Sequence, residues 1–179
     1  NMVIKSGLLT DSNSSMQYSS AKSNMKARPV SKRFVDIFLE KEADIRYELS
    51  FNRKRIFQKN LFACLRSAEM RLIVAEGWYH GGNDIGALGA LNELRKQRIE
   101  GVEDYTMETL PAVNENEYIK EDVYGQPLTP LLNAILNERR KELFMEGDRW
   151  YELKRNGRPE FWAARQGRKY TTMEFMYTF

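Results

Sequence analysis

The sequence has one cysteine and one histidine among its 179 residues. A single cysteine excludes an internal disulfide and argues against a cysteine-based metal site. Because His80 is the sole candidate base, no nucleophile–histidine–acid arrangement is visible. Gly81-Gly82 lacks the lysine and the glycine spacing of a phosphate-binding loop. We therefore predict no catalytic residue, no metal site and no cofactor.

Long apolar runs are also absent, since no stretch of about 18 apolar residues is available for a spanning helix. Residues 1–5 lack the apolar core of a secretory signal. The chain begins and ends abruptly, and we expect it to be a fragment of a longer protein. The missing signal therefore carries no weight on export.

A large excess of charge of one sign is absent as well, because 28 basic and 25 acidic side chains leave a net charge of +3. Basic clusters occur at residues 53–55, 95–98 and 139–141, and the last two lie beside glutamates. A nucleic-acid interface needs a basic face without such compensation. We predict solvated, ion-paired helix faces and no nucleic-acid partner.

Apolar residues recur mainly at helical spacing, which predicts a mostly α fold. Residues 1–30 are rich in Ser, Asn, Lys and Gly and are expected to be a loop-rich segment. Residues 31–179 are expected to form one helical domain. Ser31 is a candidate N-cap for its first helix. The apolar alternation that follows Asp44 favours a short strand at residues 45–49.

Two long helices form the centre of the prediction. Apolar residues step by four and three from Leu61 to Tyr79, and a second stripe runs from residue 84 to about residue 98. The short connection through Gly81-Gly82 makes the two helices antiparallel neighbours. Such helix pairs predict a TPR-like stacking.

A third helix is predicted to begin after Thr129, a candidate N-cap, with Pro130 at its first position. It continues as a short amphipathic turn that stops at Asn156-Gly157. The tail, residues 158–179, carries six aromatic residues, too many for a free linker, and we expect it to pack on the helices.

Residues 101–126 have no periodicity and are long for a connection between packed helices. Long ordered loops are often functional. Aromatic rings in polar loops can stack on the C–H faces of sugars, while neighbouring polar side chains bond the hydroxyls. Tyr105, Tyr118 and Tyr124 are therefore predicted to bind a ligand, and simple loop packing is the alternative.

Acidic and basic side chains alternate along residues 138–155, which read ERRKELFMEGDRWYELKR. An arginine near the apolar stripe needs carboxylate partners, because an unpaired buried charge is strongly unfavourable. A carboxylate pair for acid–base catalysis, as in glycosidases, is the alternative, but nearby arginines would keep such acids ionised. The residues assigned to a structural ion-pair network are Glu69, Glu76, Glu138, Arg139, Glu142, Glu146 and Arg149.

Three segments resemble motifs of the SusD/RagB family. Residues 66–76 resemble its R-x-A-E-M-x-L-I-x-A-E helix, and residues 87–98 resemble its A-L-x-x-L-N-x-I-R-x-R helix. Residues 138–155 resemble its E-R-R-x-E-L-x-x-E-G-x-R-x-x-D-L-x-R signature, with Glu152 in place of the usual Asp. Asp44-Ile45-Arg46 also matches a D-x-R that follows a helix in the family.

The resemblance implies a SusD-like fold of TPR-like antiparallel helix pairs with long irregular loops, of which this chain is the C-terminal part. It implies a cell-surface protein at the outer membrane, with its signal and lipid anchor outside this chain. Such proteins are not enzymes. They capture oligosaccharides or starch-like polysaccharides, or in some members peptides, for a SusC-like TonB-dependent transporter. A second interpretation of the helix pairs is a TPR-like adaptor that binds only protein partners.

Overall fold

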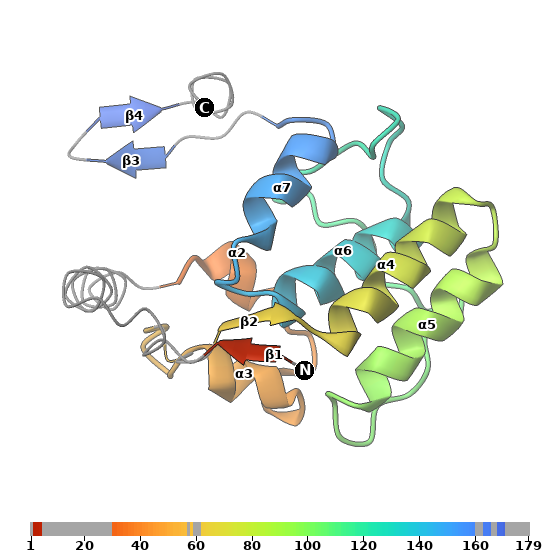
Figure 1. The fold of residues 1–179 in the computed structure, drawn as a ribbon, viewed down its shortest axis with the longest axis horizontal. Coiled ribbons are helices and arrows are strands. Elements are labelled where there is room, and N and C mark those ends of the chain that lie inside the picture. The colour runs from red at the N-terminus through yellow and green to blue at the C-terminus, as the bar shows by residue number, and fades with distance from the viewer. Residues whose placement is uncertain are drawn as a thin grey trace.

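The computed structural model describes residues 2–4, 30–56, 58, 62–159, 163–165 and 168–170. Three helices form the centre of the fold: α4 (Ser67–His80), α5 (Asp84–Lys96) and α6 (Pro130–Glu142). Figure 1 shows α4 beside α5, with α6 along another side of α4. The mostly α-helical fold that the sequence predicts is confirmed.

α4 and α5 form the predicted antiparallel hairpin. Gly82 connects them with a positive φ of 76°, a conformation that glycine adopts without steric cost. The side chain of Asn83 caps α5 by accepting a hydrogen bond from the Gly86 N–H at 2.9 Å. The small and apolar side chains buried between these helices and α6 are Ala75, Ala87, Ala90, Leu91, Leu131, Ala134 and Ile135.

α6 is the most buried of the three helices. As predicted, Thr129 caps it by accepting a hydrogen bond from the Leu132 N–H at 3.2 Å, and Pro130 occupies its first position. Most residues of α6 are buried, so its charged side chains need partners of opposite charge. Gly147, with a φ of 87°, then turns the chain into α7 (Asp148–Arg155).

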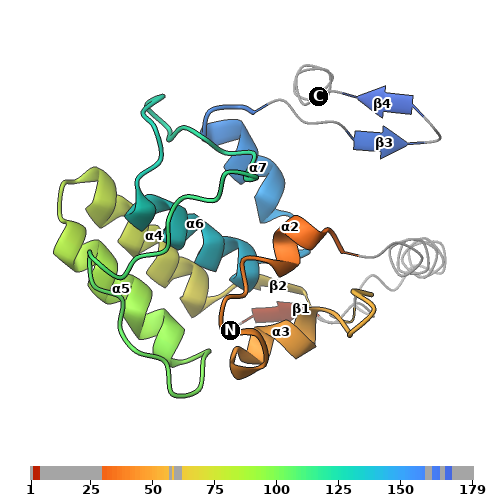
Figure 2. The same cartoon turned by 180° about the vertical axis from the view of Figure 1, so that it is seen from behind.

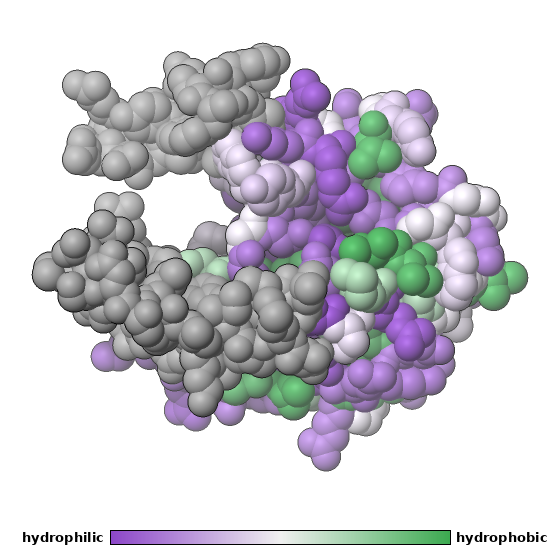
Figure 3. Space-filling model, in the orientation of Figure 1, coloured by the Kyte–Doolittle hydropathy of each residue, from purple (hydrophilic) through white to green (hydrophobic). Residues whose placement is uncertain are grey.

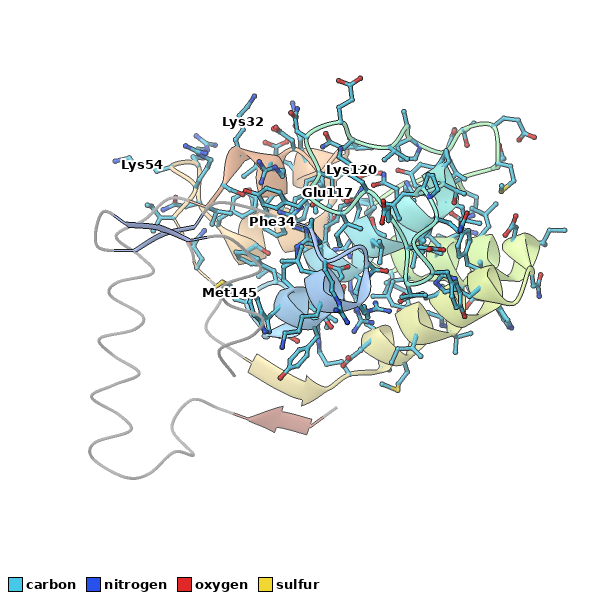
Figure 4. All side chains as sticks on the ribbon, turned by 90° about the horizontal axis from the view of Figure 1, so that it is seen from above. Lys32, Phe34, Lys54, Glu117, Lys120 and Met145 are labelled. Atoms are coloured by element: carbon cyan, nitrogen blue, oxygen red, sulfur yellow. The ribbon has the colours of Figure 1, made fainter. Side chains whose placement is uncertain are left out.

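An aromatic cluster lies against the end of α6. It begins on α2 (Lys32–Val35), which Ser31 caps as predicted by accepting a hydrogen bond from the Phe34 N–H at 3.3 Å. Phe34, labelled in Figure 4, stacks on Phe144 with ring centroids 4.2 Å apart. The cluster is completed by Ile37, Phe38, Tyr47 and Phe51.

The short strand expected after Asp44 is instead a helix, α3 (Ile45–Ser50), which a 3-10 helix, η1 (Lys41–Ala43), precedes. The Asp44 side chain caps α3 by accepting a hydrogen bond from the Arg46 N–H at 3.0 Å. This helix buries Arg46 and leaves Leu49 exposed. The strand prediction was wrong because the segment forms a helix that buries the paired Arg46. Of the alternating apolar residues, Ile45 and Leu49 are exposed and only Tyr47 packs inward.

The first long helix begins later than predicted. Residues Phe62–Leu65 form β2, which pairs antiparallel with β1 (Met2–Ile4), and α4 starts at Ser67. The segment expected to be loop at residues 1–30 therefore contributes a strand. The helical spacing that starts at residue 61 could not reveal a strand partner so far away in the sequence.

Two further strands, β3 (Ala163–Arg165) and β4 (Arg168–Tyr170), pair antiparallel after α7. The expected packing of the aromatic tail on the helices lies outside the described residues. The division into a segment of residues 1–30 and a domain of residues 31–179 stays a prediction.

A long irregular segment joins α5 to α6, as expected for residues 101–126, and in the structure it covers residues 97–129. Figure 2 shows this segment running across the helices. Ile119 anchors it, since this side chain is 1% exposed and packs against Leu132 of α6. The Leu128 N–H donates to the Lys120 carbonyl at 2.9 Å, and this bond closes residues 120–128 into a hairpin-like loop.

Apolar side chains also remain on the outward face of α4. Met70, Ile73, Val74 and Trp78 recur at helical spacing, and each is 42% to 47% exposed. Figure 3 shows apolar residues gathered over this helix. α4 therefore carries apolar residues on two faces, and only one of them is buried. Within the described residues, no helix combines the length and the apolar character needed to cross a membrane.

Candidate functional site

A cavity of about 360 Å³ lies where α4 ends and where α5 and α6 begin. Its volume is near the lower end of the range of roughly 300–1,000 Å³ that is typical of small-molecule sites. The wall opposite the helix ends comes from the irregular segment between α5 and α6. The residues that line the cavity are Tyr79, His80, Asp84, Met107, Leu110, Tyr124, Thr129, Pro130 and Leu131.

Tyr124 stands at this cavity on a tight turn. The buried Asp122 carboxylate accepts hydrogen bonds from the N–H groups of Tyr124 and Gln126, both at 2.8 Å. The Asp122 N–H donates to the Gln126 carbonyl at 2.8 Å, and Gly125 supplies the positive φ of 74° that the turn requires. The Tyr124 side chain is nevertheless 71% exposed. The turn therefore presents an aromatic ring whose backbone is fixed.

His80, the last residue of α4, lies between two tyrosine rings. Its ring centroid is 5.1 Å from that of Tyr79 and 5.3 Å from that of Tyr124, and both contacts are edge-to-face. The Nε2 atom of His80 is buried and has no hydrogen-bond partner in the described part of the chain. A buried polar atom without a partner is unfavourable, so His80 is a candidate to bond a ligand hydroxyl.

The rim of the cavity is fixed by the start of α6. The Thr129 hydroxyl donates to the Tyr79 hydroxyl at 3.0 Å, which ties α6 to the end of α4. Leu110 and Leu131 supply apolar surface beside these hydroxyls. The cavity thus combines one exposed ring, a few polar groups and an apolar floor, which is the usual composition of a ligand site.

Tyr105, the first of the three predicted ligand-binding tyrosines, lies against α5. The Arg95 guanidinium sits 3.3 Å from the centroid of the Tyr105 ring. The Asn92 side chain donates to the backbone carbonyl of Tyr105 and accepts from its backbone N–H, both at 2.9 Å. Burial, and then the negative charge of Glu40, raise the pKa of Tyr105 to about 12, although Arg95 opposes this shift. Its ring is already stacked within the protein.

Tyr118 is placed in a similar way. The Arg33 guanidinium lies 3.9 Å from the centroid of its ring, and the ring packs beside Ile119 and Leu132. Of the three tyrosines, the structure brings only Tyr124 to the cavity. Ligand binding by any of them stays a prediction, and Tyr124 is the one whose ring is accessible.

None of the other lining residues was predicted from the sequence to bind a ligand. Tyr79, His80 and Asp84 lie within six residues around the turn between α4 and α5. This polar and aromatic turn was the feature of the sequence that could have indicated a binding site. The sequence alone could not show that Tyr124 comes back to this turn.

The residues assigned to a structural ion-pair network lie elsewhere, and Glu142 is the centre of a first group. Its Oε1 atom accepts hydrogen bonds from Arg66 at 2.8 Å and Arg98 at 3.1 Å, and its Oε2 atom accepts from Arg46 at 3.2 Å. Arg66 also lies 3.1 Å from Glu146. Burial alone would raise the pKa of Glu142, but the three guanidinium groups outweigh burial and lower it.

Glu138 belongs to a second, fully buried group. It accepts hydrogen bonds from Arg46 and Lys141, both at 2.7 Å, while Asp44 accepts two from Arg46 at 2.9 and 2.7 Å. Burial alone would raise the pKa of Glu138, but Lys141 and Arg46 outweigh burial and lower it to about 2. This group joins α6 to the start of α3.

The two glutamates on the buried side of α4 meet arginines of the following helices. Arg139 forms a two-pronged pair with Asp148, at 2.9 and 2.5 Å, and also reaches Glu69 at 3.3 Å. Glu76 accepts two hydrogen bonds from Arg155, one of them at 2.8 Å. These pairs connect α4, α6 and α7.

A third group includes Glu117, a buried acid of the irregular segment that is labelled in Figure 4. It accepts hydrogen bonds from Arg140 at 2.5 Å and from Arg149. Arg149 also donates to Glu152 at 2.6 Å, and burial raises the pKa of Glu152 although Arg149 opposes this shift. Arg149 therefore links α7 to the irregular segment.

All seven residues assigned to the network have ion-pair partners. The Asp44-Ile45-Arg46 motif was the one feature of the sequence that pointed to Asp44 and Arg46 as members of the network. Its other members Arg66, Arg98 and Asp148 were not predicted. None of these seven residues lines the described cavity. That they serve the fold and not a ligand stays a prediction. Within the described ranges, no group of His, Cys, Asp and Glu could hold a metal ion.

A comparison with protein-family models matched the model described as "SusD family" over residues 8–177. Searches of curated proteins and of solved structures gave no match. The match spans nearly the whole chain, in agreement with the three sequence motifs and the helical fold. The chain therefore belongs to the SusD family, whose members are binding proteins of glycan uptake.

Proposed function

We propose that this protein captures oligosaccharides at the cell surface and delivers them to a SusC-like TonB-dependent transporter of the outer membrane. In this proposal a lipid anchor holds the protein at the outer face of that membrane, and the protein makes and breaks no covalent bond in its ligand. The observation that carries the proposal is the family match over residues 8–177.

The cavity at the end of α4 supports capture of a sugar. The exposed ring of Tyr124 offers a flat apolar face for the C–H groups of a sugar ring. Asp84 accepts hydrogen bonds, and His80 and Thr129 carry groups that bond hydroxyls. Because these residues come from three different elements that are tied together, little has to move when a ligand binds.

Calorimetric titration of the full chain against a panel of oligosaccharides and peptides tests the proposal. We expect heat of binding with at least one oligosaccharide and none with the peptides. Binding of peptides alone would replace glycan capture with peptide capture. No binding to either class, together with binding to another protein, would favour the TPR-like adaptor and contradict the proposal.

A second experiment tests the delivery step. The tagged protein is mixed with the SusC-like transporter in detergent, with and without the oligosaccharide found in the panel. We expect the two proteins to elute together in size-exclusion chromatography. Separate elution under both conditions would contradict delivery to such a transporter and would leave capture standing.

A further inference from the structure

The cavity at the end of α4 has an unusual charge for this protein. The whole chain holds 28 Lys and Arg residues, yet none of those that the structure describes lines the cavity. Among the described lining residues Asp84 is the one with a formal charge, and it forms no ion pair with any residue that the structure describes. One turn before His80, the charge of Glu76 is matched by Arg155. The formal charge at the cavity is therefore negative.

The helix ends around the cavity offer few donors to an anion. Helix N-termini bind anions through free N–H groups of the first turn. In α5, the side chain of Asn83 already accepts from the Gly86 N–H, and in α6 Thr129 accepts from the Leu132 N–H. Pro130, the first residue of α6, has no N–H. The caps therefore use one first-turn N–H group in each helix, and in α5 the negative charge of Asp84 lies in that same first turn, where it opposes the binding of an anion.

The groups that remain suit neutral hydroxyls. A carboxylate such as Asp84 accepts hydrogen bonds from sugar hydroxyls and repels a second carboxylate or a sulfate. The ring of Tyr124 attracts C–H groups through its negative face. A cleft that carries one sign of charge also lowers the local concentration of ligands with the same sign.

We infer that the cavity at the end of α4 selects uncharged sugar residues and rejects uronate and sulfated ones, and that Asp84 sets this selection. The inference rests on the proposed function and adds the chemical class of its ligand. Selection by charge needs no rearrangement, because Asp84 is the first residue of α5 and its position is fixed by the cap of that helix.

Matched ligand pairs test the inference. A neutral galactan oligosaccharide and an oligogalacturonate of the same length are titrated into the full chain at low salt, and a neutral agarose oligosaccharide is compared with a sulfated carrageenan oligosaccharide. We expect the neutral member of a bound pair to bind several-fold more tightly, because like charges a few ångströms apart repel at low salt even though Asp84 is exposed and water weakens the repulsion. In Asp84→Asn, the ratio of neutral to anionic affinity should fall several-fold.

Asp104→Asn serves as the control, because Asp104 is an exposed acid that pairs with Lys96 outside the cavity. This variant should keep the wild-type ratio. Tighter binding of the anionic members, or an unchanged ratio in Asp84→Asn, would overturn the selection and leave glycan capture intact. Binding of neither member of any glycan pair would contradict the proposed function and the inference together.

Discussion

Asp122 fixes the backbone of Tyr124: its Oδ1 atom accepts a hydrogen bond from the Tyr124 N–H at 2.8 Å. The same oxygen bonds the Gln126 N–H, and the Asp122 side chain is buried although the Tyr124 ring is exposed. A buried acid therefore determines where an accessible aromatic ring stands at the cavity.

Replacing Asp122 should weaken ligand binding without touching the ligand. Hydrogen bonds to a charged group contribute about 1.5–3 kcal/mol, so Asp122→Ala should free the turn and lower oligosaccharide affinity several-fold. Asp122→Asn keeps one carbonyl oxygen and should lose less. Titration gives the affinity, and hydrogen exchange of the Gln126 amide reports opening of the turn. Faster exchange with unchanged affinity would show that the turn does not position Tyr124.

Glu142 should matter for stability and not for binding. Three arginines surround this buried carboxylate, and removal of one partner of a buried pair costs about 3–5 kcal/mol. Glu142→Gln should therefore lower the melting temperature strongly, while the folded variant keeps its oligosaccharide affinity. A large loss of affinity at unchanged stability would contradict the structural role.

Glu93→Gln is the matched control for that variant. Glu93 pairs with Arg71 on the surface, where both side chains are about half exposed. Exposed pairs contribute about 0–1 kcal/mol, so this variant should melt close to the wild type. A comparable drop in both variants would mean that the loss of any glutamate destabilises the fold.

Acid should destabilise the protein through its buried carboxylates. The pKa of Glu138 is about 2 in the folded state, against an ordinary value of 4.5. Because the folded pKa is the lower one, the stabilisation is complete above pH 4.5 and is lost as the pH falls toward 2. The pKa values of Glu142 and Glu117 are lowered as well, which adds to the same trend.

Melting temperatures should therefore stay level from pH 7 to about pH 5 and fall steeply below it. The difference in pKa corresponds to about 3 kcal/mol for Glu138 alone. Glu138→Gln should be less stable at pH 7 and should depend less on pH below 4.5. An equally steep fall in this variant would assign the acid sensitivity to other groups.

Two glycines of α5 should respond in opposite ways to alanine. A Cβ at Gly86 would lie 2.9 Å from the ring of Trp78 and 2.7 Å from the side chain of Asn83, so the ring or the helix cap must move. Nothing lies within 4 Å of a Cβ at Gly89. Replacing a helix glycine by alanine stabilises by roughly 0.5–1 kcal/mol where there is room. Thermal melting should show Gly89→Ala above and Gly86→Ala below the wild type.

Local signals were the most predictable part of this fold. Ser31 and Thr129 were identified as helix caps because a cap involves only the residue and the turn that follows it. The α4–α5 hairpin followed from two apolar stripes and the short glycine connection. The α3 helix was missed, because its stability depends on Arg46 reaching Glu138 across the fold.

The candidate site was only partly predictable for the same reason. The aromatic and polar character of the segment after α5 indicated Tyr105, Tyr118 and Tyr124 alike. The approach of Tyr124 to His80 depends on the path of the whole segment across the helices. Tyr105 has the same chemistry, yet Arg95 and Asn92 hold it inside the fold. Composition identifies candidate rings, and burial decides which of them a ligand can reach.

The central claim is that a sugar binds at the cavity beside Tyr124. The most direct measurement is calorimetric titration of the oligosaccharide found in the panel into Tyr124→Ala and, as a matched control, Tyr151→Ala. Both tyrosines are about equally exposed, at 71% and 67%, but Tyr151 lies on α7 and does not line the cavity. We predict that Tyr124→Ala loses affinity by about tenfold or more while Tyr151→Ala binds like the wild type. Equal affinity in both variants would contradict the account.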